Sequence, residues 1–204
     1  MVLDASTLRT VEVVDESTSG DDLYGWSVKS DAAHTYLFSH CYQQFGYETL
    51  LGMGECAVDI KLARVPLGEF DAEREYWDGS AWNADGATAT PVVNSTFVGS
   101  GNNPAQISYD GKQFILVQKR DDWWGTAIDF GVAGTPQGPF VHVESIDEPR
   151  GCQLGACNTY FASWVPWNDS SGSRIWSIGH NRWNGSETES HLVDYRPTFH
   201  TIDL

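Results

Sequence analysis

Short apolar runs with polar residues at alternate positions recur along the chain, and turn-forming residues separate them. Gly, Asp, Asn and Pro bound the runs, and no long stretch keeps the 3.6-residue period of an amphipathic helix. The pattern therefore predicts an all-β protein. The expected strands are Gly25–Lys29, Thr35–Ser39, Ile60–Val65, Ala105–Tyr109, Gln113–Gln118, Ala127–Val132, Tyr160–Trp164, Arg174–Ile178 and His191–Tyr195.

The expected strands fall into three similar units, at approximately residues 21–85, 98–147 and 156–204. Each unit starts with a short strand, a turn and an apolar strand, and a polar loop and further strands follow. The turns lie at Ser30–Asp31, Asp110–Gly111 and Asp169–Gly172. Repeats of three or four strands are typical of the blades of a β-propeller, and a β-sandwich with coincidental periodicity is the alternative.

A propeller of three blades would leave two open sheet edges, which favour aggregation. Because propellers close with about four to eight blades, we expect further N-terminal blades or a second chain to complete the ring. Thr10–Val14 alternates like a strand and is a candidate for the last strand of a preceding blade.

The net negative charge of the chain limits the classes of partner that it could bind. The formal net charge is −16, with 12 Lys and Arg against 28 Asp and Glu. This charge would repel a phosphate backbone or an anionic membrane surface, so nucleic acid is not an expected partner. No run of about 18 apolar residues is present, so membrane insertion is not expected either.

Aromatic residues are abundant, with nine Trp, eight Tyr and nine Phe. Many must lie in the core, because aromatic rings bury large areas. Several Trp residues nevertheless stand among polar residues, where a ring could stack on the flat face of a sugar. An acidic, Trp-rich β protein is therefore a candidate for binding a polysaccharide or oligosaccharide.

The four cysteines form two local pairs, Cys41 with Cys56 and Cys152 with Cys157. Two short-loop disulfides would suit an oxidising compartment, which indicates a secreted or cell-surface protein. A zinc site built from all four thiolates is the alternative, but neither spacing is a CxxC knuckle.

Several segments resemble the DUF4185 family. They are Ile60–Phe70, the YWDG element with its following tryptophan at Glu75–Trp82, the repeat from Gln106 to Gln118, the turn Gly134–Phe140, and Ile175–Asn181. The resemblance implies a five-bladed propeller related to glycoside hydrolases, some of which look like endo-acting arabinanases. The chain would then supply the last three blades, and essential carboxylates would lie on earlier ones.

Hydrolysis of a glycosidic bond usually needs two carboxylates that flank it. Asp22, before the first inner strand, and Asp121, after the apolar strand of the second unit, are the candidate catalytic residues. Each also has a structural interpretation, Asp22 as a turn acid and Asp121 as part of a hairpin loop. Whether the chain is an enzyme stays open.

Candidate sugar-binding residues lie on the inner strands and in two polar-aromatic clusters at equivalent places in the second and third units. Their alternative role is to satisfy buried backbone groups or to form ordinary loops. The candidates are Trp26, Asn103, Gln106, Lys119, Arg120, Trp123, Trp124, Asn158, Tyr160, His180, Asn181, Arg182 and Trp183.

Three functional hypotheses result. The chain is a glycoside hydrolase-like propeller acting on an arabinan-type polysaccharide, a non-catalytic carbohydrate-binding or adhesion propeller, or a partial propeller that another chain completes. No phosphate-binding glycine loop, HExxH, GxSxG or EF-hand pattern is present. No cofactor or metal site is therefore expected, and a structural calcium ion stays open.

Overall fold

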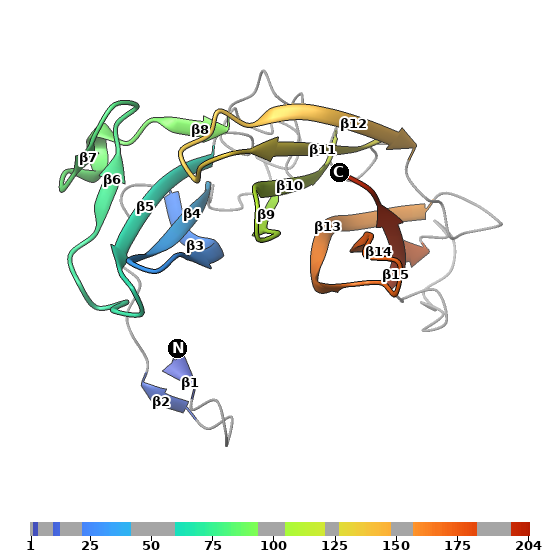
Figure 1. Cartoon of the computed structure of the whole chain (residues 1–204), viewed down its shortest axis with the longest axis horizontal. Helices are drawn as coiled ribbons and strands as arrows, with labels where there is room; N and C mark the ends of the chain where they lie inside the picture. Colours follow the sequence, from blue (N-terminus) through green and yellow to red (C-terminus); the bar gives the residue numbers. More distant parts are fainter. Residues whose placement is uncertain are drawn as a thin grey trace.

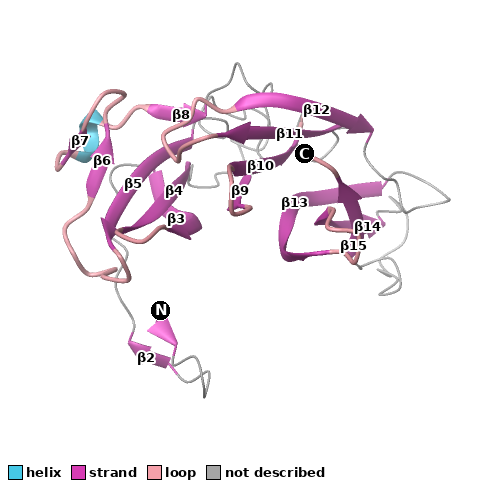
Figure 2. Ribbon diagram, viewed as in Figure 1, coloured by secondary structure: helices cyan, strands magenta, loops and turns pink. Residues whose placement is uncertain are grey.

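The computed structural model describes almost pure β-structure (Figure 2). Within the described residues the one helical segment is a short 3-10 turn, η2 (Gly86–Thr88), and none of their helices is long and apolar enough to cross a membrane. The all-β prediction is confirmed. The described residues are 2–3, 10–12, 22–41, 60–93, 105–120, 127–147, 157–182 and 197–204.

Three antiparallel sheets follow one another along the chain (Figure 1). None of them closes on itself. The first has the order β3-β4-β5-β6-β7, and β8 also pairs with β5. Its strands are β3 (Asp22–Ser30), β4 (His34–Cys41), β5 (Ile60–Pro66), β6 (Glu75–Trp77), β7 (Trp82–Asn83) and β8 (Pro91–Val93).

The second and third sheets keep the order of the sequence, because each strand turns back to pair with the one before it. The second sheet comprises β9 (Gln106–Tyr109), β10 (Phe114–Lys119), β11 (Ala127–Ala133) and β12 (Val141–Asp147). The third comprises β13 (Cys157–Asn168), β14 (Arg174–Arg182) and β15 (Pro197–Ile202). Eight of the nine predicted strands are present, and His191–Tyr195 lies outside the described residues. β15 is not among the predicted strands.

Apolar side chains hold the sheets face to face. One core cluster joins the first and second sheets and includes Phe38, Leu62, Ile107 and Leu116. A second cluster joins the second and third sheets and is built around Trp176. On β10, side chains alternate between the two clusters, Leu116 on one side and Val117 on the other. The second sheet is therefore buried on both faces along this strand.

The first strands of the three sheets are neighbours. β3 contacts β9, and β9 contacts β13 (Figure 1). The backbone N–H of Ile107 donates to the Ser27 hydroxyl across the boundary between the first two sheets, at 3.1 Å. The three sheets therefore fan outward from β3, β9 and β13, which we call the inner strands.

The same aspartate turn connects the first two strands of each of these three sheets. The Oδ1 atoms of Asp31, Asp110 and Asp169 each accept two backbone N–H groups of the residues that follow, at 2.7–2.9 Å. An aspartate can do this because its short side chain mimics a backbone turn. These are the three turns that the sequence predicts, so the repeat of three units is present in the turns as well as in the strands.

The YWDG element is another local turn. Asp78 Oδ1 accepts the N–H groups of Ser80 and Ala81, and Gly79 has a φ of 97°. That backbone conformation favours glycine, so the Asp-Gly pair is required by the turn between β6 and β7. The structural interpretation of this motif agrees with the geometry.

The two described N-terminal strands pair with each other. β1 (Val2–Leu3) pairs with β2 (Thr10–Glu12) in a separate two-stranded sheet (Figure 1). The prediction that Thr10–Val14 is the last strand of another blade is therefore not supported. An alternating strand pattern indicates extended backbone but does not specify its pairing partner.

The first of the three aspartate turns provides a test of stability. Tyr36 donates a hydroxyl hydrogen bond of 2.7 Å to Asp31 Oδ2. This bond and the backbone N–H groups hold the pKa of Asp31 below its usual value, whereas burial, with Asp31 beside the ring, raises the pKa of Tyr36 to about 12. Asp31→Ala should lower the free energy of unfolding by about 1–2 kcal/mol at neutral pH, measured by urea denaturation.

This loss should depend on pH in a defined direction. Because the folded-state pKa of Asp31 is lowered, its stabilisation is complete above the unfolded-state pKa and disappears as the pH falls through the lower folded-state pKa. The difference between wild type and variant should therefore shrink in acid. Asp71→Ala, at an exposed turn aspartate, is the control and should change stability little. A difference that stays constant down to strongly acidic pH would contradict the assignment.

Candidate functional site

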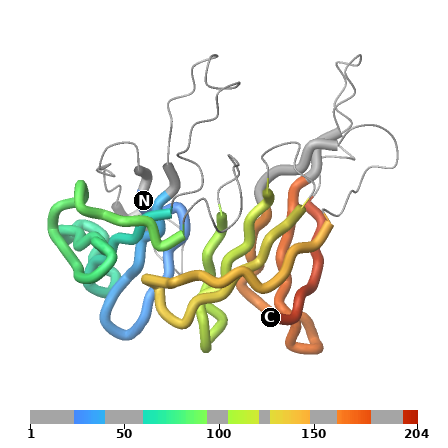
Figure 3. Tube along the Cα trace, turned by 90° about the horizontal axis from the view of Figure 1, so that it is seen from above, coloured from blue at the N-terminus to red at the C-terminus, as the bar shows by residue number. Residues whose placement is uncertain are grey.

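The antiparallel connections divide the strand ends into two groups. We call one group the Asp22 end; it contains Asp22 of β3, Gln106 of β9, Lys119 of β10 and Cys157 of β13. The other, the Asp31 end, contains the three aspartate turns. Arg174 donates to the backbone oxygen of Asp110 at 2.8 Å, so the second and third sheets point the same way. Figure 3 shows the described strands running between these two ends.

The predicted site residues belong to the Asp22 end as far as the structure describes them. Residues placed by their strand positions alone are Asp22, Asn158, Tyr160, His180, Asn181 and Arg182. Side chains are described for Trp26, Gln106, Lys119 and Arg120. Five candidates lie outside the described residues: Asn103, Asp121, Trp123, Trp124 and Trp183. The sheets therefore bring the described candidates to one side of the molecule.

The cysteine predictions also fall at this end. Cys41 ends β4 and Cys157 begins β13, while Cys56 and Cys152 lie outside the described residues. The structure describes none of the four cysteine side chains. The two pairings therefore stay predictions.

Trp26 lies in an irregular part of its inner strand. Along β3 the pairing with β4 shifts between Tyr24 and Ser27, so Gly25 and Trp26 are extra residues in the ladder. Gly25 has a φ of 103°, which favours glycine at this position. Such bulges redirect a side chain out of the regular alternation of a strand. Trp26 remains 36% exposed, whereas Tyr24 beside it is buried.

Gln106 lies next to this bulge. The hydrogen bond between Ile107 and Ser27 brings β9 and β3 together, and Gln106 and Trp26 each precede one of these two residues. They therefore lie at the same level of adjacent inner strands. Gln106 is half-buried and carries both a donor and an acceptor. An indole and an amide in this arrangement can offer a flat apolar face and hydrogen bonds to one ligand.

The end of β10 carries two cations with different surroundings. The Lys119 side chain is fully buried, which favours a structural role for it. Arg120 is 37% exposed and pairs with Asp129 of β11, whose side chain is fully buried. The Nε atom of Arg120 donates to Asp129 Oδ2 at 2.8 Å, and Nη2 donates to Oδ1. This two-point contact fixes the guanidinium at the base of the β10–β11 connection.

Two side chains from β12 complete a polar cluster around Asp129. Ser145 donates to Asp129 Oδ1, and His142 Nε2 lies 2.7 Å from Ser145 Oγ and 3.4 Å from Asp129 Oδ1. A serine, a histidine and an aspartate also form catalytic triads, but there the aspartate contacts the second ring nitrogen. Here the same nitrogen, Nε2, faces both partners, and the Ser145 hydroxyl donates its hydrogen bond to the carboxylate and not to the histidine. The arrangement does not activate a nucleophile.

Asp129, Ser145 and His142 are not among the site residues predicted from the sequence. One signal was present: Asp129 interrupts an otherwise apolar run between Ile128 and Phe130. The position of His142 could not be predicted, because residues 142 and 145 of a regular strand face opposite sides. A register shift between Phe130 and Gly131 of β11 brings both onto the face of Asp129.

Metal ions need ligand sets of several side chains that lie close together. Among the residues with described positions, no group of three or more His, Cys, Asp or Glu side chains could hold a metal ion. A structural calcium ion stays an open alternative.

The chain matches the family described as a domain of unknown function, DUF5005, over residues 1–202. It belongs to that family. The expected membership of DUF4185 is therefore wrong. Two of the segments that resemble it, the YWDG element and Gly134–Phe140, contain local turns, in which Asp78 accepts the N–H groups of Ser80 and Ala81 and Gly138 N–H donates to the Thr135 oxygen. No curated protein matches the chain.

The Arg120–Asp129 contact provides a second stability test. Asp129→Ala should destabilise the protein by about 2–4 kcal/mol, because it leaves the Arg120 charge without its buried partner and opens a small cavity. The surface pair Arg64–Glu75, with Glu75 47% exposed, is the matched control. Glu75→Ala should cost about 0–1 kcal/mol in the same urea titration. Equal losses in the two variants would show that burial of Asp129 adds nothing.

Proposed function

We propose that this chain is a carbohydrate-binding part of a β-propeller, and that it binds a polysaccharide or oligosaccharide along the inner strands at the Asp22 end. The observation that carries the proposal is the bulge of β3, which leaves Trp26 partly exposed beside Gln106 of the next inner strand. Sugars combine flat C–H faces with hydroxyl groups, and an aromatic ring beside an amide is complementary to both.

The propeller part of the proposal rests on the repetition of the sheets. Three antiparallel sheets of consecutive strands pack face to face, their first strands are neighbours, and each begins with the same aspartate turn. Radial repetition of this kind is how propeller blades are arranged. A complete ring would need further blades, from additional sequence or from a second chain.

Binding is better supported than hydrolysis. A hydrolase needs a carboxylate that can take up or release a proton, and another opposite the scissile bond. Asp129 is a buried carboxylate near this end, but Arg120 and Ser145 occupy its oxygens. The candidates Asp22 and Asp121 keep the enzyme hypothesis testable. The arabinan substrate was implied by the resemblance to DUF4185 alone, so it is no longer part of the proposal.

An extracellular location would suit this function. The cysteine spacing favours disulfides, and the charge of −16 would keep the protein soluble and away from anionic surfaces. The proposed setting is therefore a secreted or cell-surface protein whose partner is a glycan.

Binding can be measured by screening the protein on a glycan array and titrating the best ligand by calorimetry. Trp26→Ala should weaken binding by about tenfold or more, because it removes the stacking surface. Trp167→Ala is the matched control: Trp167 is 64% exposed but lies in the last part of β13, toward the Asp31 end. It should leave the affinity unchanged.

Two outcomes would contradict the proposal. One is equal loss of affinity in the two tryptophan variants, which would indicate a general surface effect. The other is release of reducing ends from the bound polysaccharide, abolished by Asp22→Asn or Asp121→Asn, which would establish a hydrolase instead.

A further inference from the structure

A polar cavity lies at the opposite end of the sheets from the proposed glycan site. It has a volume of about 300 Å³ and is formed by the aspartate turn of the second sheet, the aspartate turn of the third sheet and the residues after β15. Small-molecule sites occupy about 300–1,000 Å³, so this cavity has room for a ligand of about one sugar unit. Its polar side chains are Asp110, Lys112, Gln113, Ser173, Arg174 and Asp203.

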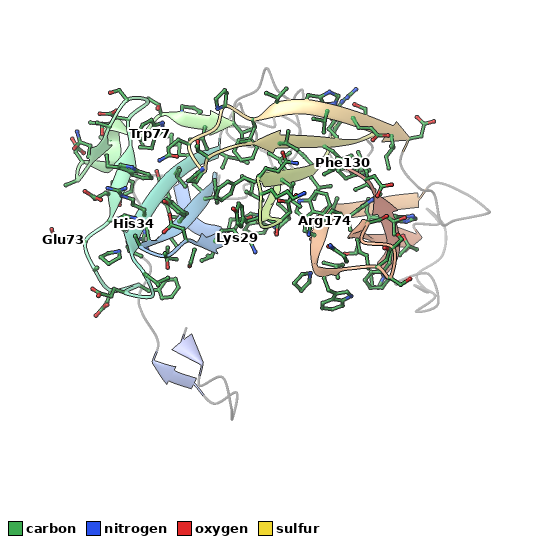
Figure 4. All side chains as sticks on the ribbon, in the orientation of Figure 1. Lys29, His34, Glu73, Trp77, Phe130 and Arg174 are labelled. Atoms are coloured by element: carbon green, nitrogen blue, oxygen red, sulfur yellow. The ribbon has the colours of Figure 1, made fainter. Side chains whose placement is uncertain are left out.

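Arg174 is held rigidly in the wall of this cavity. Figure 4 shows it on the side of the third sheet that faces the second. Its Nη1 donates to Asn168 Oδ1 at 2.8 Å, and its Nη2 donates to the Asp110 backbone oxygen at 2.8 Å. Nη2 also lies 3.4 Å from Asp110 Oδ2. A guanidinium fixed in this way loses little conformational entropy if it also binds a ligand in the cavity.

The turn that carries Lys112 and Gln113 is equally well defined. Asp110 Oδ1 accepts the backbone N–H groups of both residues at 2.8 Å. Their side chains therefore start from a fixed backbone. Lys112 is exposed, and Gln113 is half-buried.

The charged side chains of the cavity balance. Two cations, Lys112 and Arg174, stand against two carboxylates, Asp110 and Asp203. An anionic ligand would be attracted by the first pair but repelled by the second and by the overall charge of −16. A cationic ligand would be attracted by the two carboxylates but repelled by Lys112 and Arg174. A neutral ligand with several hydroxyl groups avoids both, because each hydroxyl can donate to a carboxylate and accept from a cation.

From this composition we infer a second saccharide site, which takes one neutral sugar unit in the cavity between the Asp110 and Asp169 turns. Lys112 and Arg174 donate to its hydroxyl oxygens, and Asp203 accepts from its hydroxyl groups. This site does not depend on the proposed function of the Asp22 end. The two sites lie at opposite ends of the strands, so one glycan unit could not contact both.

Ligand-observed saturation-transfer NMR suits this test, because single sugars bind weakly. The probes are D-glucose, D-galactose, D-mannose and L-arabinose, with D-glucuronate as the anionic comparison. At least one neutral sugar should bind the full chain. Lys112→Ala and Asp203→Asn should each weaken that binding by about tenfold, the usual effect of losing a charge-assisted hydrogen bond.

Controls separate the two sites and guard against unfolding. Trp26→Ala should retain the NMR signal of the neutral sugar, whether or not it weakens binding on the glycan array. Lys112 and Asp203 are exposed, so their substitution should leave the urea midpoint unchanged. The inference is overturned if no neutral sugar binds, if both cavity variants bind as wild type does, or if glucuronate binds more tightly than every neutral sugar.

Discussion

The structure depends on burying both faces of its middle sheet. The side chains of β10 alternate between two apolar clusters, with Leu116 packed toward the first sheet and Val117 toward the third. A single antiparallel sheet would expose at least one of these faces to water, at a cost of about 25 cal/mol per Å² of apolar surface. Face-to-face packing removes that cost, and it also brings the inner strands together, where the candidate site lies.

Polar groups determine the local structure at the two ends of the packed sheets. At the Asp31 end, three aspartates satisfy backbone N–H groups that tight turns leave without strand partners. At the Asp22 end, one buried aspartate holds Arg120 at the base of a connection, and a glycine bulge redirects Trp26. The Asp31 end is therefore built from repeated local turns, and the Asp22 end from departures from regular strand geometry. Bulges and buried charges are common near ligand sites, which is consistent with the proposed binding role of the Asp22 end.

Much of the fold was predictable, because strands and turns are encoded locally. The alternation of apolar residues identified eight described strands, and Asp, Gly and Ser identified the three turns. Strand pairing was less predictable. Thr10–Glu12 pairs with Val2–Leu3, and the third sheet includes Pro197–Ile202, which no alternating apolar pattern indicated. Pairing partners are chosen by long-range contacts, and a period-two pattern carries no information about them.

The candidate site, like the fold, was predictable from the sequence only in part. The sequence by itself determined that the chain is all-β, repeats in three units, is strongly acidic and carries polar-aromatic clusters at equivalent strand ends. Only the tertiary structure decided that Trp26 occupies a bulge beside Gln106, that Lys119 is buried, and that Asp129 gathers Arg120, Ser145 and His142. Two of these relationships, the positions of Trp26 and His142, depend on register shifts between strands. A shift of one residue reverses which face the following side chains occupy, and extra residues leave the ladder altogether; an alternating pattern does not specify where either occurs.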